Sequence, residues 1–253
     1  MSGILRKGLP VLALAVALTG TEARAQSDDP GALAERIQAM AIEAASTGDD
    51  EGLRQSVALA ERALALHPEE ALLYHYQGYA LYRLAGKHGC DEAREPGCVM
   101  ALLERAEESL EASNLHGPRA ETYALLASVA GLMIGENDAL APSLGHRIDD
   151  LQSKALSLDA ENPRVWLLRG IGNYFTPEAY GGGIAPARAA LERSAAAFQT
   201  DAPPTPEPRW GRADVHVWLG QVHQAAGDMA LAREEYEKAG RLHQERHMKA
   251  VKT

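Results

Sequence analysis

The chain has 253 residues, of which 35 are acidic and 25 are basic, giving a formal net charge of −10. This excess of negative charge repels phosphate backbones and anionic lipid surfaces, which disfavours nucleic acid as a partner. Alanine and leucine are abundant and runs of β-branched residues are scarce, which argues against an all-β fold.

The first 25 residues have the features of a cleaved secretory signal peptide. Arg6 and Lys7 precede an apolar run from Leu9 to Gly20, and Ala23-Arg24-Ala25 has the small-x-small form of a cleavage site. We therefore expect a mature chain that starts at Gln26 and is periplasmic or secreted. The apolar run is shorter than the about 20 residues of a spanning helix, so we expect no stable membrane insertion. An uncleaved anchor is the alternative.

After Gln26, apolar residues recur at intervals of three and four, which is the period of an α-helix. Residues that form turns divide the chain into segments of helix length, at Gly48-Asp49, His67-Pro68, Gly117-Pro118, Asn162-Pro163, Gly181-Gly182-Gly183 and Pro203-Pro204. These features predict an all-α chain of roughly ten helices.

The two cysteines, Cys90 and Cys98, enclose a segment that contains Pro96 and Gly97 and can turn back on itself. Because an exported protein meets an oxidising compartment, we expect a disulfide between them. A metal pair is the alternative, but two cysteines eight positions apart lack the close double spacing of a zinc site. We expect neither a metal nor a cofactor.

The glycines at 181–183 precede a helical segment and could present backbone N–H groups to an anion. However, Ile184, Ala185 and Pro186 follow them instead of the Gly-Lys-Ser/Thr of a phosphate loop, so a tight turn is favoured.

His243 and His247 are four residues apart near the C-terminus, a spacing that places both on one helical face. Gln244 stands where a metalloprotease helix needs its catalytic glutamate, so a solvated helix end is favoured. No other nucleophile–base or paired-carboxylate set can be assembled, and we expect that the chain is not an enzyme.

Small residues recur at fixed places in these helical segments. Gly78, Ala127, Gly170 and Gly220 each follow a bulky or aromatic residue by four positions: Tyr74, Tyr123, Trp166 and His216. In the last segment, Gly227 is followed by Ala232, Tyr236 and Ala239, and Gly182, Ala187, Leu191 and Ser194 repeat these offsets. Two helices can approach within about 8–10 Å only where the facing residues are small. We therefore expect Gly220 to face Ala232 and Ala239.

This spacing resembles the tetratricopeptide repeat (TPR), a helix–turn–helix unit of about 34 residues. The resemblance implies a right-handed α-solenoid in which stacked pairs cover each other's apolar sides. We identify one domain, residues 26–253, with units at about 33–68, 71–114, 120–160, 163–199 and 213–248. The departures from the pattern are insertions at about 85–99, 131–147 and 174–183, and a proline-rich link at 201–209.

The same resemblance implies a binding surface on the concave face, which is lined by the first helix of each pair. The residues expected there are His75, Tyr79, Tyr82, Leu167, Ile171, Tyr174, Phe175 and Gln221. The lysines and asparagines with which chaperone-binding relatives hold a peptide carboxylate are absent from these positions. The alternative is that the aromatic side chains pack against the insertions.

We therefore expect a non-enzymatic exported scaffold that binds an envelope protein or a peptide in its concave groove. The alternative is an accessory subunit of a solute transporter that binds a small apolar molecule, for which the aromatic lining is suited.

Overall fold

A computed structural model describes residues 28–86 and 89–250; the predicted signal peptide lies outside the described residues. The described chain forms ten α-helices and no strand. The helices are α2 (Pro30–Thr47), α3 (Asp50–Leu66), α4 (Ala71–Ala85), α5 (Cys98–His116), α6 (Ala120–Glu136), α7 (Ala141–Leu158), α8 (Pro163–Phe175), α9 (Ile184–Ala197), α10 (Asp214–Ala225) and α11 (Met229–Ala250). The all-α prediction is confirmed.

Local chemistry fixes where several helices begin. The side chain of Asp29 accepts a hydrogen bond from the Ala32 N–H (2.8 Å), and Pro30 occupies the first turn of α2. Asn162 caps α8 in the same way, ahead of Pro163. A capping oxygen satisfies one of the free N–H groups of a helix start, and proline suits the first turn because its missing N–H is not needed there.

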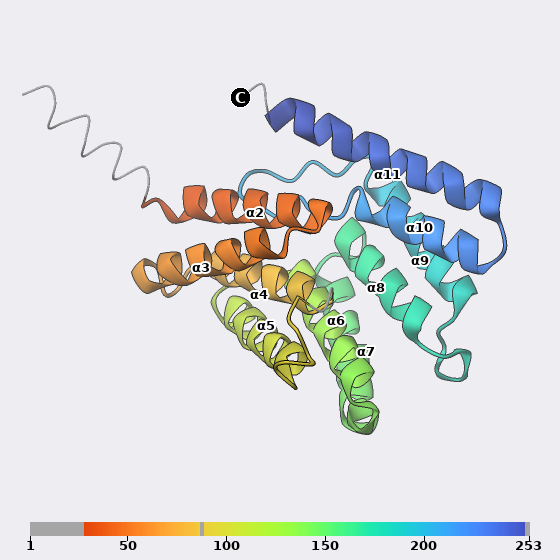
Figure 1. The fold of residues 1–253 in the computed structure, drawn as a ribbon, viewed down its shortest axis with the longest axis horizontal. Helices are drawn as coiled ribbons and strands as arrows, with labels where there is room; N and C mark the ends of the chain where they lie inside the picture. Colours follow the sequence, from red (N-terminus) through yellow and green to blue (C-terminus); the bar gives the residue numbers. More distant parts are fainter. Residues whose placement is uncertain (1–27, 87–88, 251–253) are drawn as a thin grey trace, which may run out of the picture.

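The helices form five pairs that follow one another in chain order, from α2 and α3 to α10 and α11 (Figure 1). Each first helix contacts the first helix of the next pair, from α2 through α4, α6 and α8 to α10. Among the described residues, no contact of similar extent joins the second helices of successive pairs. The first helices therefore form the inner, concave layer of a solenoid.

Glycines mark the closest contacts within the pairs. A Cβ on Gly78 would lie 2.5 Å from Leu110 Cγ of α5, and one on Gly170 would lie 2.6 Å from Leu191 Cγ of α9. At Gly220 the nearest group is the ring of Tyr236, at 2.5 Å. Tyr236, which lies between Ala232 and Ala239 in the sequence, therefore covers the glycine, and both alanines are buried.

The four departures from a regular repeat take different forms. The first is a loop after α4, and the third contains the short 3-10 helix η2 (Glu178–Tyr180) between α8 and α9. The segment 131–147 forms no separate loop: it is the end of α6, the 3-10 helix η1 (Asp138–Leu140) and the start of α7. Its residues lengthen this helix pair.

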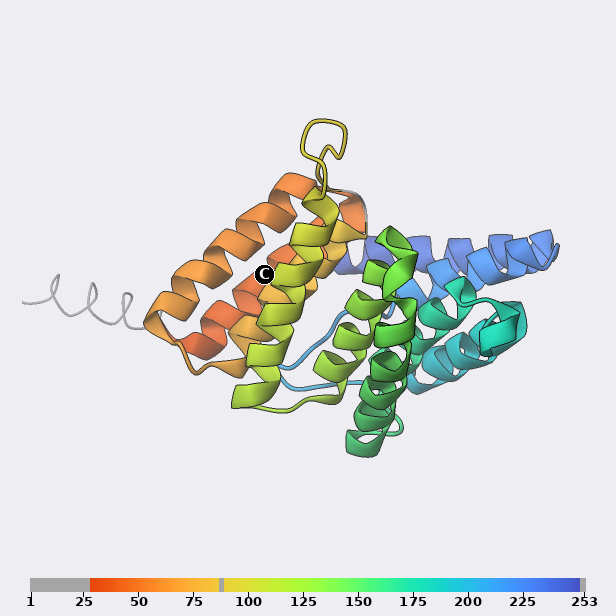
Figure 2. The same ribbon diagram turned by 90° about the horizontal axis from the view of Figure 1, so that it is seen from below.

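The fourth departure, predicted as a proline-rich link at 201–209, belongs to a longer segment that contacts distant helices. Residues 201–213, which we call the clasp segment, leave the end of α9, reach across to α2 and α4, and return to α10 (Figure 2). The segment lies against the first helices, on the concave side. It contacts residues up to 174 positions earlier in the chain, at the Arg209–Glu35 ion pair.

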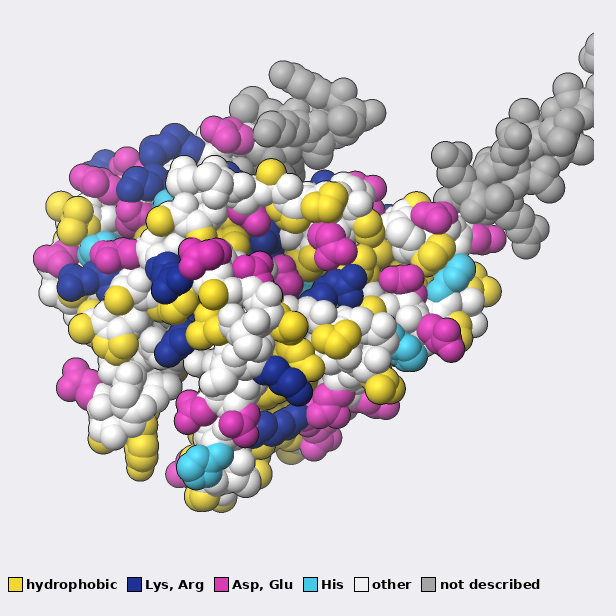
Figure 3. All heavy atoms as spheres, turned by 180° about the vertical axis from the view of Figure 1, so that it is seen from behind, with side chains coloured by type: hydrophobic (Ala, Val, Ile, Leu, Met, Phe, Trp, Pro, Cys, Tyr) yellow, Lys and Arg dark blue, Asp and Glu magenta, His cyan; other side chains and the backbone are white. Residues whose placement is uncertain are grey.

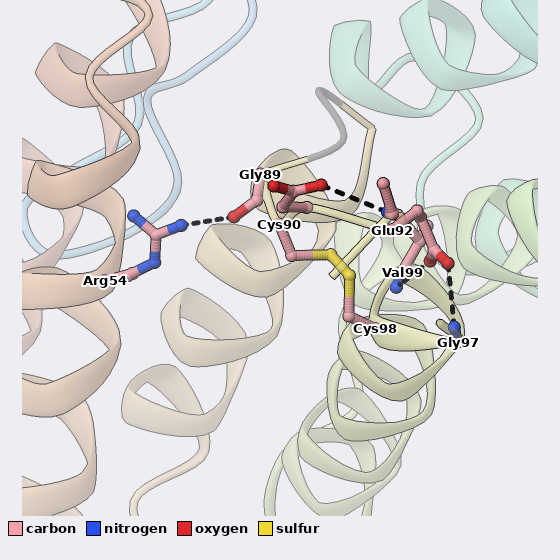
Figure 4. The surroundings of a disulfide bond; sticks show 9 residues. Arg54, Gly89, Cys90, Glu92, Gly97, Cys98 and Val99 are labelled. Atoms are coloured by element: carbon pink, nitrogen blue, oxygen red, sulfur yellow. Dashed lines mark hydrogen bonds between the residues drawn. A yellow bond between two sulfur atoms is a disulfide. The ribbon is translucent and has the colours of Figure 1, made fainter. Parts of the chain in front are cut away.

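Cys90 and Cys98 form a disulfide, as the sequence predicted, with their Cα atoms 6.2 Å apart (Figure 4). It closes the loop between α4 and α5. The carboxylate of Glu92 accepts hydrogen bonds from the N–H groups of Gly97 and Val99, both at 2.8 Å, and Arg54 of α3 donates to the Gly89 carbonyl. The loop is thus fastened to the start of α5 and to the first pair.

We expect the double variant Cys90→Ser/Cys98→Ser to fold but to lose about 2 kcal/mol of unfolding free energy, because a short closed loop restricts the unfolded chain. Urea denaturation followed by circular dichroism measures this loss. Wild-type protein in a reducing agent is the matched control and should show the same loss. A reduced wild type as stable as the oxidised form would contradict the expectation.

Candidate partner-binding site

The structure divides the eight residues predicted for the concave face into two groups. His75, Tyr79 and Leu167 are buried, each with at most 2% of its surface exposed. Tyr82, Ile171, Tyr174 and Gln221 are half-buried, and Phe175 is 67% exposed. Only the second group is accessible to a partner in this conformation.

The clasp segment covers two of the three buried residues, Tyr79 and Leu167. The Tyr79 ring stacks on Trp210 with centroids 5.1 Å apart, and a Cβ on Gly211 would lie 2.9 Å from the Leu167 side chain. We correct the expectation that Tyr79 and Leu167 line an open groove: the chain's own segment fills that part of the concave face. The alternative raised by the sequence was packing against the insertions, whereas Tyr79 packs against Trp210, just after the proline-rich link.

His75 is fully buried and faces α6. Its Nδ1 lies 2.8 Å from the Thr122 hydroxyl, and its Nε2 has no hydrogen-bond partner. Burial, followed by the charges of Arg119 and Arg164, lowers the pKa of the His75 imidazole from 6.5 to about 3. His75 is therefore neutral near pH 7, and it is a structural residue rather than a contact for a partner, which corrects its predicted role.

Polar contacts hold the clasp segment to the first two pairs. The side chain of Gln38 on α2 donates to the carbonyls of Pro206 (3.2 Å) and Glu207 (3.3 Å) and accepts from the N–H of Arg209 (2.6 Å). The Tyr76 hydroxyl also donates to the Pro206 carbonyl. Both Gln38 and Tyr76 are at most 1% exposed.

Ion pairs join the segment to three other places on the solenoid. Arg164 of α8 binds both carboxylate oxygens of Asp201, at 3.0 and 2.7 Å. Arg119, just before α6, binds Glu207 at 3.2 Å, and Arg209 binds Glu35 of α2 at 3.0 Å. These contacts tie α2, α6 and α8 together through one extended segment.

The other half of the concave face carries an aromatic cluster where α8 ends. Tyr174 and Phe175 are 5.1 Å apart between ring centroids, and each lies within 6 Å of Trp218 on α10, at 5.9 and 5.7 Å. The sequence analysis missed Trp218. Its position three residues before Gln221, which was expected on the concave face, was the available indication, because such residues share a helix face.

Beside this cluster is a hollow of about 430 Å³ lined by Tyr174, Gln221, Gln224, Ala225 and Tyr236, which we call the C-terminal hollow. The Tyr236 hydroxyl donates to the Gln224 side-chain oxygen (3.1 Å) at its edge. A second hollow of about 390 Å³ shares Gln224 and Tyr236 and continues along α11 past Met229 and Arg233. Tyr236, expected only as a repeat residue, also contributes to both hollows.

Tyr82 and Ile171 pack partly against the core between the two halves of the concave face. Burial raises the pKa of the Tyr82 phenol. Its neighbour Arg83 pairs with Asp214 (3.3 Å) and donates to the Tyr79 hydroxyl (3.2 Å), which joins α4 to the start of α10. These contacts give Tyr82 and its surroundings a packing role beside any contact with a partner.

Acidic, basic and hydrophobic side chains are intermixed over the face seen in Figure 3. In the described part of the chain, three possible metal ligands come together at Cys90, Glu92 and Cys98, and the disulfide occupies both sulfurs.

No helix within the described ranges combines the length and the apolar character of a bilayer crossing.

No protein-family model matches the sequence, and no curated protein matches it. Solved structures do resemble the fold. The HusA haemophore from Porphyromonas gingivalis aligns with a TM-score of 0.58 and 20% identity, over 73% of this chain and 92% of its own. TTC0263, a thermophilic TPR protein of Thermus thermophilus, aligns with a TM-score of 0.53 and 18% identity, over 81% of this chain and 89% of its own. At this identity the likeness concerns the fold alone, which is that of a TPR-type α-solenoid.

Proposed function

We propose that this TPR-type chain is an exported, non-enzymatic scaffold that binds a segment of an envelope protein. The C-terminal hollow carries the proposal, because it is the part of the predicted concave surface that remains open beside exposed aromatic residues. Phe175 is 67% exposed although it contacts two other aromatic rings. Aromatic residues in such positions commonly supply most of the binding energy of an interface.

The lining of the hollow defines the chemistry of the occupant. Tyr174 and Tyr236 offer ring surface, and the amides of Gln221 and Gln224 can each donate and accept hydrogen bonds. This combination suits an apolar or aromatic side chain together with the main chain on either side of it. The Cys90–Cys98 disulfide and the predicted signal peptide support a location outside the cytoplasm.

The variant Tyr174→Ala tests the site. We expect partner recovery to fall at least about tenfold, because a ring that anchors a partner contributes more than about 1.4 kcal/mol. The measurement is quantitative pull-down from envelope extract with a photo-crosslinker at position 221. Tyr180→Ala is the matched control, since Tyr180 is 82% exposed on η2 and does not line the hollow. Equal recovery with both variants, or no partner above background, would refute the proposal.

A planar apolar molecule is the second candidate, favoured by the cluster of Tyr174, Phe175 and Trp218. The haemophore HusA, whose fold resembles this one, gives a probe for it. If this candidate is correct, titration with haemin will change the Soret absorbance of the wild type and of Tyr180→Ala but not of Tyr174→Ala. An unchanged spectrum for all three proteins excludes a porphyrin ligand.

A further inference from the structure

The middle of the clasp segment, residues 202–209, is held differently from its two ends. Ala202, Pro204, Thr205 and Arg209 are exposed and Pro203, Pro206 and Glu207 are half-buried, whereas Pro208, Trp210 and Gly211 are buried. These middle residues, which we call the tip, are therefore mostly accessible at the surface, with Pro208 buried among them. The ends of the segment are anchored to α8 through Asp201 and to α4 through Trp210.

The solenoid contacts the main chain of the tip in a way that does not depend on its side chains. Gln38 donates to two successive carbonyls and accepts from the N–H of Arg209, and Tyr76 donates to one of the same carbonyls. Gln38 and Tyr76 are almost fully buried while the tip is in place, so their polar atoms are shielded from water and bond to the main chain of the tip. An extended stretch of another chain offers the same carbonyl and N–H groups.

Two ion pairs also require particular side chains in any segment that occupies this surface. Arg119 donates to both carboxylate oxygens of Glu207, at 3.2 and 3.4 Å, and Glu35 accepts from Arg209 at 3.0 Å. A guanidinium that binds a carboxylate through two nitrogens discriminates by geometry as well as by charge. The surface thus fits an acidic residue followed two positions later by a basic one, in an extended chain that tolerates proline.

We propose that the concave face of α2, α4 and the start of α6 is a second binding surface, which the tip occupies as an intramolecular ligand. Its external partner is an extended protein segment with a proline-flanked glutamate and an arginine two residues later. The partner binds when the tip lifts while Asp201 and Trp210 hold the segment's ends. This surface is separate from the C-terminal hollow and does not depend on the function proposed there.

Because the tip already occupies the surface, the proposal predicts how tightly an external peptide binds with and without the tip. A tethered segment competes at an effective concentration on the order of millimolar, so the intact chain should bind an external copy of the tip weakly. Removing the tip should reveal the intrinsic affinity of the surface. In the emptied surface, water replaces the tip at the polar groups of Gln38 and Tyr76, and the peptide displaces that water when it binds.

The experiment uses the mature chain with residues 202–209 replaced by a Gly–Ser linker of equal length. The probe is the acetylated and amidated peptide APPTPEPR, which reproduces residues 202–209. We expect calorimetric titration to show affinity at least about tenfold tighter for the linker variant than for the intact chain. A peptide with lysine in place of the glutamate should bind the linker variant poorly. It should bind better when Arg119→Glu is added, which reverses the charge of the site.

A folded linker variant, identified by native helicity and cooperative melting, that does not bind APPTPEPR would overturn the proposal. So would equal affinity of the peptide for the linker variant and the intact chain. If the linker variant does not fold, Glu207→Lys in the intact chain replaces it, because this change repels Arg119 and loosens the tip with its length unchanged. Peptide binding no tighter than that of the wild type would then overturn the proposal.

Discussion

Gly78→Leu is expected to lower the free energy of unfolding by about 3 kcal/mol, the upper part of the usual range for overpacking. A Cβ at this position would lie 2.5 Å from Leu110 Cγ and 3.2 Å from the carbonyl oxygen of Ala106, both on α5. Leu110 is fully buried and the carbonyl is backbone, so neither can move without separating α4 from α5. Urea denaturation followed by circular dichroism at 222 nm, a standard helix signal, measures the loss.

Gly131→Leu is the matched control for this prediction. Gly131 is also inside a first helix, α6, but a Cβ there would meet nothing within 4 Å. Because leucine favours helix over glycine by up to about 1 kcal/mol, this variant should be as stable as the wild type or slightly more so. Gly220→Leu should fall between the two, because the ring that covers Gly220 belongs to Tyr236, which is 37% exposed and can rotate outward. Equal losses at Gly78 and Gly131 would show that glycine at position 78 has no packing role.

The helix pairs could be predicted because the information is local. The spacing from Tyr74 to Gly78, and from Trp166 to Gly170, predicts a close contact between helices that are neighbours in sequence. The disulfide also follows from two cysteines eight positions apart and an expected oxidising location. Such features need only the order of the residues within one unit.

The path of the clasp segment could not be predicted from the same kind of pattern. A proline-rich stretch has no periodicity to indicate which surface it contacts, and its main partner, Gln38, lies 171 residues before Arg209. Two of the eight residues predicted for the concave face, Tyr79 and Leu167, are consequently buried against it. Whether the concave face is open or filled is decided by these contacts between residues that are distant in the sequence.

The second large effect on unfolding free energy is expected at the Arg164–Asp201 ion pair, where the clasp segment begins. Arg164 is 1% exposed, and Asp201 accepts the hydrogen bonds of both its terminal nitrogens while Arg164 Nε has no partner. The guanidinium also lies 5.5 Å from the centre of the Phe198 ring. Asp201→Asn would keep the shape of the side chain but leave a buried positive charge without its counterion. We expect a loss of about 3 kcal/mol in unfolding free energy.

Two further variants separate this cause from a simple loss of shape. The double variant Arg164→Met/Asp201→Leu removes both charges, and because apolar replacements of a buried pair are often neutral, it should recover most of the lost stability. Glu161→Gln breaks the exposed pair with Arg193, whose side chains are 79% and 46% exposed, and should change stability by less than about 1 kcal/mol. Chemical denaturation of all three proteins at one pH and salt concentration gives the comparison. If Asp201→Asn is no more destabilising than Glu161→Gln, the Arg164–Asp201 pair does not hold the clasp segment to α8.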